Sequence, residues 1–285
     1  MKRILITGLN SYVGNNLGKW LENYPDEYSV DFISLRDNEW KDRDFSGFDV
    51  VFHVAGIAHV SKNPKMEEMY YKINRDLTVE VAKRAKSVGV KQFVFMSSII
   101  VYGNSSNNNG VIDRYTIPKP IDFYGRSKLQ AEDGIKALAT DAFKVAIIRP
   151  PMIYGKNSKG NFPKLAKVAL KTPLFPELDN RRSMLHVDNL CEFIRVIVKN
   201  EEGGTFFPQN KKYVKTSEMV KLIAEVNEKN LRLTKIFNPV LKFLITKSNL
   251  INKVFGNLIY DQSISRYKED YQIRSLRESI ELTIN

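Results

Sequence analysis

The beginning of the chain constrains its fold more than any other stretch. The run Arg3–Thr7 has an apolar centre, the turn Gly8–Gly14 follows it, and Asn15–Leu21 then shows helical spacing of its apolar residues. A short, continuously apolar run is typical of a parallel strand that is buried on both faces. A glycine turn between such a strand and a helix directs backbone N–H groups and the positive helix end at an anionic pyrophosphate. We therefore predict an α/β fold with a dinucleotide site after the first strand.

Three turns of the predicted sheet supply the candidate cofactor residues. The first turn reads Gly-x-x-Ser-x-x-Gly, and Ser11 stands where a middle glycine is expected. Its hydroxyl could contact phosphate, or the turn could simply begin a helix. After the second strand, Arg36 suits the 2′-phosphate of NADP, whereas Asp37 would suit NAD, so NADP(H) is favoured and NAD(H) stays possible. The predicted cofactor residues in these turns are Gly8, Asn10, Ser11, Tyr12, Val13, Gly14, Arg36, Ala55 and Gly56.

A tyrosine and a lysine carry the predicted chemistry. Tyr124 and Lys128 are four residues apart in a predicted helix over 123–138, so their side chains lie on one helix face. A lysine charge near a phenol favours the phenolate, and we expect it to lower the Tyr124 pKa toward the range of a general acid or base. The alternative is that Lys128 is only a solvated surface residue. The strand over 92–98, which ends in Ser97 and Ser98, precedes this helix.

The rest of the pattern alternates strands and helices. This order predicts a Rossmann-type, doubly wound parallel sheet, with a smaller lobe for substrate that is interleaved with it in sequence. We expect further strands over 30–35, 49–56 and 144–149, helices over 64–87 and from 160, 188 and 217 onwards, a lid-like loop over 104–110, a loop over 173–176, and a strand and helix over 271–282. The predicted dinucleotide-binding domain comprises 1–155 and about 186–212, and the sugar-binding lobe comprises about 156–185 and 213–285.

Composition narrows the class of partner. The chain has 285 residues, one cysteine and a net charge of +12. A lone Cys191 cannot form an internal disulfide, which fits a cytoplasmic protein. The charges of both signs interleave, so we expect no nucleic-acid partner. No apolar stretch is long enough to span a membrane, and we expect no membrane insertion. The amphipathic segment 237–258 could lie on a membrane surface, but we expect it to pack within the smaller lobe. We expect His53 to be a packed strand residue, and neither His53 nor His59 to bind metal.

Taken together, these motifs resemble those of the extended short-chain dehydrogenase/reductase family, and more narrowly of its NAD(P)-dependent nucleotide-sugar epimerase/dehydratase branch. The resemblance rests on Thr7-Gly8…Gly14, on Ser98, on Tyr124-x-x-x-Lys128 and on Arg182…His186-Val187-Asp188. It covers nearly the whole chain and is strongest from Arg3 to Gly155.

The resemblance implies a role for each matching residue. Ser98 would hydrogen-bond the sugar oxygen, Tyr124 would exchange the proton, and Lys128 would bind the nicotinamide ribose. Arg182 would grip the diphosphate of the substrate, and Asn161 would lie near the same phosphates. For these two residues the alternatives are a surface salt bridge and a plain helix cap. Tyr124, Lys128 and Pro151 complete the predicted cofactor contacts. The resemblance also implies a homodimer.

Two reactions are open within this branch. The departures at Ser11 and Arg36 favour a reductase that consumes NADPH, and the C-terminal part is similar to reductases of UDP-4-keto-6-deoxy-N-acetylhexosamines. The alternative is a UDP-hexose 4-epimerase that keeps NAD bound. A non-catalytic NADP-sensing or RNA-binding scaffold is a third hypothesis, and the intact Ser98, Tyr124 and Lys128 set disfavours it.

Overall fold

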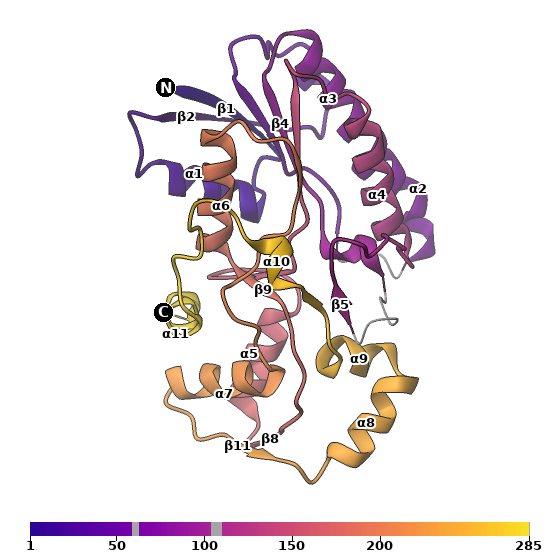
Figure 1. Cartoon of the computed structure of the whole chain (residues 1–285), viewed down its shortest axis with the longest axis vertical. Helices are drawn as coiled ribbons and strands as arrows, with labels where there is room; N and C mark the ends of the chain where they lie inside the picture. Colours follow the sequence, from indigo (N-terminus) through magenta and orange to yellow (C-terminus); the bar gives the residue numbers. More distant parts are fainter. Residues whose placement is uncertain (59–62, 104–109, 285) are drawn as a thin grey trace.

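A parallel sheet of six strands forms the centre of the computed structural model, which describes residues 1–58, 63–103 and 110–284 (Figure 1). Every pairing in this sheet is parallel. Across the sheet the strands run β10 (Gly204–Phe206), β6 (Lys144–Ile148), β4 (Gln92–Met96), β3 (Val50–His53), β1 (Lys2–Thr7) and β2 (Tyr28–Ile33). The predicted doubly wound α/β fold is confirmed. The sequence prediction missed β10, and β2 begins and ends two residues before the expected strand.

Helices cover both faces of the sheet. Successive side chains of a strand point to opposite faces, and on β1 Ile4 and Ile6 belong to one core cluster while Leu5 belongs to the other. The first cluster contains residues of α1 (Tyr12–Leu21) and α6 (Val187–Lys199), and the second contains residues of α3 (Leu77–Ser87) and α4 (Phe123–Lys136) (Figure 1). The sheet is therefore buried from both sides, which explains its continuous apolar strands.

The helix predicted over 64–87 is not uniform. It begins as the 3-10 turn η2 (Pro64–Met66), continues as α2 (Glu67–Tyr70), and widens into the π-helical turn η3 (Tyr71–Asp76) before α3. A π-turn inside a helix often marks a functional site. The sequence pattern could not reveal this change because the apolar spacing continues through it. The lid-like loop over 104–110 lies, apart from Gly110, outside the described residues, as does His59.

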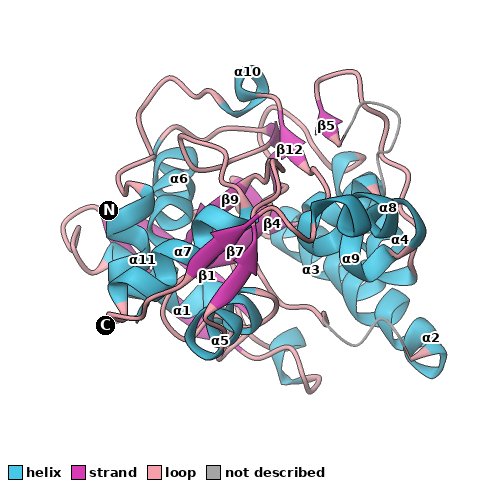
Figure 2. Cartoon of the chain, turned by 90° about the horizontal axis from the view of Figure 1, so that it is seen from below, coloured by secondary structure: helices cyan, strands magenta, loops and turns pink. Residues whose placement is uncertain are grey.

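A second lobe packs below the sheet around its own core. Tyr154, Phe162, Met219 and Val220 are among the residues that form this core. Its elements are α5 (Phe162–Lys171), α7 (Thr216–Val226), α11 (Leu276–Ile284) and the strand pair β8 (Leu174–Pro176) and β11 (Arg232–Thr234) (Figures 1 and 2). Two predictions are wrong here. The loop expected over 173–176 contains β8, because parallel pairing with β11 satisfies its backbone, and the strand expected after 271 is absent from the described chain.

Short elements join the two lobes and complete the chain. The pairs β7 (Met152–Tyr154) with β9 (Met184–His186) and β5 (Val111–Ile112) with β12 (Ile259–Tyr260) are parallel. The remaining elements are η1 (Glu39–Lys41), η4 (Ile99–Tyr102), α8 (Asn238–Lys247), α9 (Asn249–Phe255) and α10 (Gln262–Ser265). Ser217, at which we expected a helix to begin, lies inside the first turn of α7 (Thr216–Val226), whose N-cap is Lys215. None of the helices described is long and apolar enough to span a bilayer.

Candidate active site

A cavity of about 860 Å³ lies beyond the ends of the first three strands of the chain. Six of the predicted cofactor residues line it: Gly8, Asn10, Ser11, Arg36, Ala55 and Gly56. The carboxyl edge of a parallel sheet is where ligands bind in doubly wound folds. Two other predicted cofactor residues do not line it: the side chain of Val13 packs into the core, and Pro151 is buried between β6 and β7.

The turn after β1 is shaped so that a ligand backbone can approach closely. Gly8 has φ of +99°, and a Cβ atom there would lie 3.0 Å from the Ala55 nitrogen. Asn10 also has a positive φ, of 67°, which asparagine tolerates better than most residues. A side chain larger than hydrogen at position 8 would therefore be strained and would crowd the third turn. This tight turn fits the pyrophosphate of a dinucleotide, for which the N-terminus of α1 supplies the positive dipole.

Ser11 takes the role of a helix cap. Its φ of −67° is ordinary for a residue with a side chain, and its Oγ accepts a hydrogen bond of 3.0 Å from the Gly14 nitrogen. The serine therefore replaces a glycine without strain and stabilises the start of α1. Tyr12 does not line the cavity: its buried hydroxyl lies beside Gly155 and has no hydrogen-bond partner among the described residues.

The other end of the cavity carries an arginine. Arg36 is exposed there and makes no ion pair with a carboxylate of residues 1–58, 63–103 or 110–284. Asp37 uses its Oδ1 to accept a hydrogen bond of 3.1 Å from the Glu39 nitrogen. Nearby Lys41 is paired with Glu80 at 2.8 Å. The guanidinium of Arg36 is thus available to an anion at this end.

The three candidate catalytic residues come together on β4 and α4, and Lys128 adjoins the cavity. Ser98 ends the segment after β4, and its side chain hydrogen-bonds Tyr124 in the first turn of α4. Lys128 lies one turn further along α4, where its Nζ donates a hydrogen bond of 2.9 Å to the carbonyl of Met96. A Cβ atom at Gly56 would lie only 3.4 Å from that Nζ. The lysine is buried and lies next to Gly56, which lines the cavity, so it is not a solvated surface residue.

The acid–base properties of this group differ from our expectation. Burial, followed by the neighbouring Tyr70 and Asp122, raises the pKa of Tyr124 to about 12. Burial lowers the pKa of Lys128 to about 8, against the opposing charge of Glu132. The prediction that Lys128 lowers the Tyr124 pKa is therefore wrong for the protein by itself. The main reason is burial, which penalises the charged form of the phenol, and the ammonium donates its hydrogen bond to the Met96 carbonyl. A phenol that stays protonated at neutral pH is suited to donate a proton.

Behind these residues lies a buried ion pair that the sequence analysis missed. Glu132 and Arg149 pair through two nitrogens of the guanidinium, and Arg149 also donates a bond of 2.7 Å to the Tyr102 hydroxyl. Ser97 donates a 2.5 Å bond to the same carboxylate. Because Ser97 precedes Ser98, this network fixes the end of β4 from behind. The available signal was the spacing of Glu132, which is one helical turn beyond Lys128.

Asn74, in the π-turn, is a second functional candidate that the sequence analysis missed. Its Oδ1 accepts a 2.9 Å bond from the Ile57 nitrogen, and its Nδ2 donates to the Ile57 carbonyl and to the Ser127 hydroxyl. The side chain thus ties the turn after β3 to the helix that carries Tyr124 and Lys128. The signal was a polar residue within an otherwise apolar helical stripe.

The two predicted substrate residues lie in the second lobe. Arg182 donates a 3.2 Å bond to the Gly256 carbonyl, and burial lowers its pKa to about 10. No salt bridge to Arg182 occurs among the described residues, so the surface salt-bridge alternative is not observed. Asn161 is exposed at the start of α5, and its side chain makes no capping bond. Both side chains are therefore available to a polar ligand.

His53 is confirmed as a packed strand residue. It is fully buried, shares hydrogen bonds with Thr7 and Thr78 at 2.8 and 3.0 Å, and stacks on Phe93 and Phe95. Its pKa falls to about 3, first because of burial and then because of the nearby charge of Lys128. The ring therefore stays neutral at neutral pH and has a structural role.

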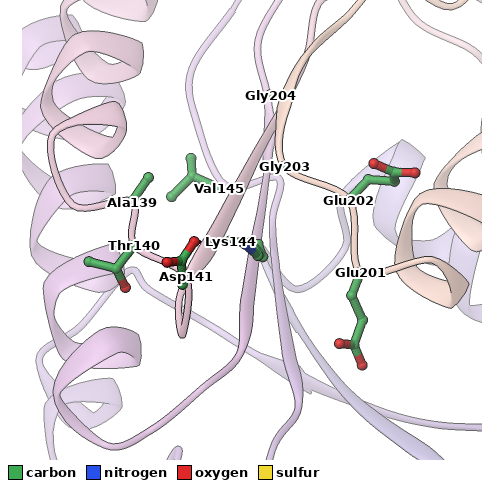
Figure 3. Close-up of a pocket in the computed structure, with 9 residues that line it drawn as sticks. All are labelled: Ala139, Thr140, Asp141, Lys144, Val145, Glu201, Glu202, Gly203 and Gly204. Atoms are coloured by element: carbon green, nitrogen blue, oxygen red, sulfur yellow. Dashed lines mark ion pairs between the residues drawn. The ribbon is translucent and has the colours of Figure 1, made fainter.

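Another hollow lies at the opposite edge of the sheet, where β6 and β10 begin (Figure 3). Its charged groups already have partners: Lys144 pairs with Asp141, Glu201 with Lys2, and Glu202 with Lys268. Figure 3 shows the two glutamates on the other side of the strands from Asp141. The amino edge of a parallel sheet is not where doubly wound folds bind ligands, so we assign no ligand to this hollow.

Fold and site together define a class of enzyme. A doubly wound sheet, a glycine turn fitted to a dinucleotide, and a serine–tyrosine–lysine group beside it are the features of NAD(P)-dependent enzymes of the short-chain dehydrogenase/reductase type. Residues 4–207 match the family described as the NAD dependent epimerase/dehydratase family. The chain belongs to this family, and it is an NAD(P)-dependent enzyme.

Similar proteins agree with this assignment. The chain is 30% identical to a UDP-glucose 4-epimerase of Vibrio cholerae, over 94% of this chain and 89% of that protein. It is 31% identical to an N-acetyl-alpha-D-glucosaminyl-diphospho-ditrans,octacis-undecaprenol 4-epimerase of Escherichia coli O157:H7, over 71% of this chain and 61% of that one. Among solved structures, a protein named RMD from Pseudomonas aeruginosa, complexed with NADPH, superposes with a TM-score of 0.76 at 18% identity, covering 99% and 98% of the two chains.

Proposed function

We propose that this enzyme is an NADP(H)-dependent reductase of the 4-keto group of a nucleotide sugar, with a UDP-6-deoxy-N-acetylhexosamine as the best-matched substrate. One observation carries the proposal: Lys128 of the Ser98–Tyr124–Lys128 group adjoins Gly56 in the lining of a dinucleotide-sized cavity, and the cavity also presents Arg36, which pairs with no carboxylate of the described residues. An unpaired guanidinium at that end suits a 2′-phosphate, and Asp37 is engaged in its own turn. NADPH use in turn favours net reduction.

Each residue of the candidate site has a separate role in the proposed reduction. The cofactor, when bound, supplies the hydride. Tyr124 donates its phenolic proton to the sugar oxygen that becomes a hydroxyl, and its raised pKa keeps that proton in place at neutral pH. Ser98 holds the same oxygen by a hydrogen bond. Lys128 contributes a positive charge beside Gly56, where it would bind the nicotinamide ribose. Arg182 and Asn161 bind the diphosphate of the substrate.

The reaction is tested by incubating the purified chain with NADPH or NADH and with UDP-4-keto sugars, and by following products by mass spectrometry. The proposal predicts a 4-hydroxy sugar, with one NADPH oxidised per product. A product formed with no net change in added cofactor would contradict net reduction.

The cofactor preference has its own test. We expect Arg36→Ala to raise the KM for NADPH by about 10- to 100-fold, as expected for the loss of a charge-assisted contact to phosphate, and to leave the KM for NADH nearly unchanged. Lys83→Ala, an exposed change on α3, is the matched control. Equal losses with both cofactors would show that Arg36 does not read the 2′-phosphate.

A 4-epimerase is the second candidate, and the relatives named above favour it, because both are 4-epimerases with about 30% identity to this chain. The same three residues would then act twice, with NAD kept in place. Mass spectrometry of the cofactor in the purified protein separates the two candidates: retained NAD with interconversion of UDP-hexoses supports the epimerase, and exchangeable NADP supports the reductase.

A further inference from the structure

The helix α8 and the two residues before it present an apolar surface that the described part of the chain leaves exposed. Ile236, Phe237, Val240 and Phe243 are 80%, 46%, 62% and 63% exposed, and α8 contains no buried residue. The opposite side of the helix, with Leu241 and its neighbours, is half-buried. The expectation that this segment packs within the lobe is therefore met only on one side. We call Ile236, Phe237, Val240 and Phe243 the α8 apolar surface.

The charges around this surface have one sign. Lys235, Lys242 and Lys247 are exposed on or beside α8, and none of them pairs with a carboxylate of the described residues. No aspartate or glutamate occurs in the sequence between Glu228 and Asp261. Exposed apolar side chains bordered by unpaired lysines are the pattern of a helix that lies in the interface of an anionic membrane.

The position of α8 in the molecule allows such contact. It lies at the outer edge of the second lobe, packed mainly on α9, and away from the six-stranded sheet (Figures 1 and 2). The helix has ten residues, which corresponds to a length of roughly 15 Å, so it can lie along a bilayer surface but cannot cross it. A second copy of the chain is a poorer occupant, because a symmetric contact would bring two lysine-bordered surfaces together.

We propose that the α8 apolar surface and its three lysines dock this enzyme on a membrane that contains anionic lipids. The apolar side chains enter the boundary between headgroups and acyl chains, and the ammonium groups contact lipid phosphates. The proposal does not depend on the substrate or on the direction of the reaction. It predicts binding that requires anionic lipid and that weakens at high salt.

The test is flotation of the full chain with phosphatidylcholine vesicles, with and without phosphatidylglycerol. We expect the chain to float only with the mixed vesicles. Val240→Ser combined with Phe243→Ser, and separately Lys242→Glu combined with Lys247→Glu, should each reduce vesicle binding by at least about tenfold. Far-ultraviolet circular dichroism checks that each variant is folded.

Matched controls lie on the other lobe. Ile117→Ser removes an apolar side chain that is 82% exposed, and Lys65→Glu with Lys83→Glu makes the same change in net charge. Both controls should float as the unchanged protein does. Equal flotation with neutral vesicles, equal losses in the controls, or no flotation at all would overturn the proposal. So would a sedimentation result in which the Val240 and Phe243 changes dissociate a dimer without affecting vesicle binding.

Discussion

The sheet and the α8 region of the second lobe use similar side chains in opposite ways. Phe52 on β3 is fully buried between helices, whereas Phe243 on α8 is 63% exposed. The charged groups differ in the same sense. Glu132 and Arg149 are buried and satisfied by each other, while the lysines of α8 have no carboxylate partner in the described chain. A buried charge must find its partner within the protein, and an exposed apolar side chain must find one outside it or remain in water.

This contrast distinguishes the candidate active site, whose residues are held in the interior, from the solvent-exposed face of α8. The site residues on β4 and α4 are held by interior bonds, such as that of Lys128 to the Met96 carbonyl and that of Ser97 to Glu132. Such preorganisation is what proton transfer needs. The exposed side chains on the outer face of α8 make no comparable interior bonds. Substituting them should therefore have little effect on the fold. The following predictions test this difference, from the largest expected effect to the smallest.

Removing the buried carboxylate should have the largest effect on stability. Glu132→Ala leaves the Arg149 guanidinium buried without its counter-ion, so we expect the free energy of unfolding to fall by about 3–5 kcal/mol. Urea denaturation measures this change. Glu225→Ala on α7 is the control, because its partners Lys221 and Arg277 are half-exposed at the surface, and it should cost less than about 1 kcal/mol. Similar losses in the two variants would contradict the contrast.

The buried histidine should make the sheet sensitive to acid. The folded-state pKa of His53 is about 3, below its ordinary value of 6.5. Between these two pH values His53 binds a proton in the unfolded chain but stays neutral in the folded chain. Stability attributable to this group therefore falls as the pH drops from 6.5 toward 3, by about 2 kcal/mol at pH 5.

Replacing His53 isolates this effect. In His53→Gln the loss of stability between pH 7 and pH 5 should be smaller by about that amount, whatever the variant costs at pH 7. Denaturant titrations at both pH values measure it. If the unchanged protein and the variant lose stability in parallel, the ring is protonated in the folded state or does not control the acid response.

The smallest effect is expected on α8. Phe243→Ala should change the free energy of unfolding by less than about 0.5 kcal/mol, since the side chain is largely in water already. The same change at Phe52, in the centre of the sheet, should cost about 3–5 kcal/mol. Thermal or urea unfolding of the two variants gives the comparison. A large loss at Phe243 would mean that α8 is part of a core.

Most of the sheet and its turns were predictable because their structure depends on residues that are adjacent in the sequence. A continuous apolar run, the glycine at φ of +99° and the helix cap at Ser11 each correspond to a recognisable pattern of a few adjacent residues. The short strands β8 and β10 have no such pattern. Each has three residues and depends on a distant partner, Arg232–Thr234 for β8 and β6 for β10.

The residues of the candidate site could be proposed from the sequence, but their electrostatics could not. Spacing identified Tyr124 and Lys128, yet it implied that the ammonium would act on the phenol. In the structure the ammonium contacts Met96 on β4, which is distant from α4 in the sequence. Likewise Glu132 and Arg149 are 17 residues apart in the chain and meet only because α4 packs on β6. Interactions that depend on tertiary packing are not encoded in any short pattern.

Turnover by Tyr124→Phe tests the central claim most directly. The change removes only the phenolic oxygen, so the fold and the binding of NADPH, measured by fluorescence titration, should persist. We predict that kcat with the preferred UDP sugar falls by a factor of about 10² to 10⁴, as expected for the loss of a positioned proton donor. A variant that binds NADPH and turns over within about twofold of the unchanged enzyme would contradict the assignment of Tyr124 as the proton donor.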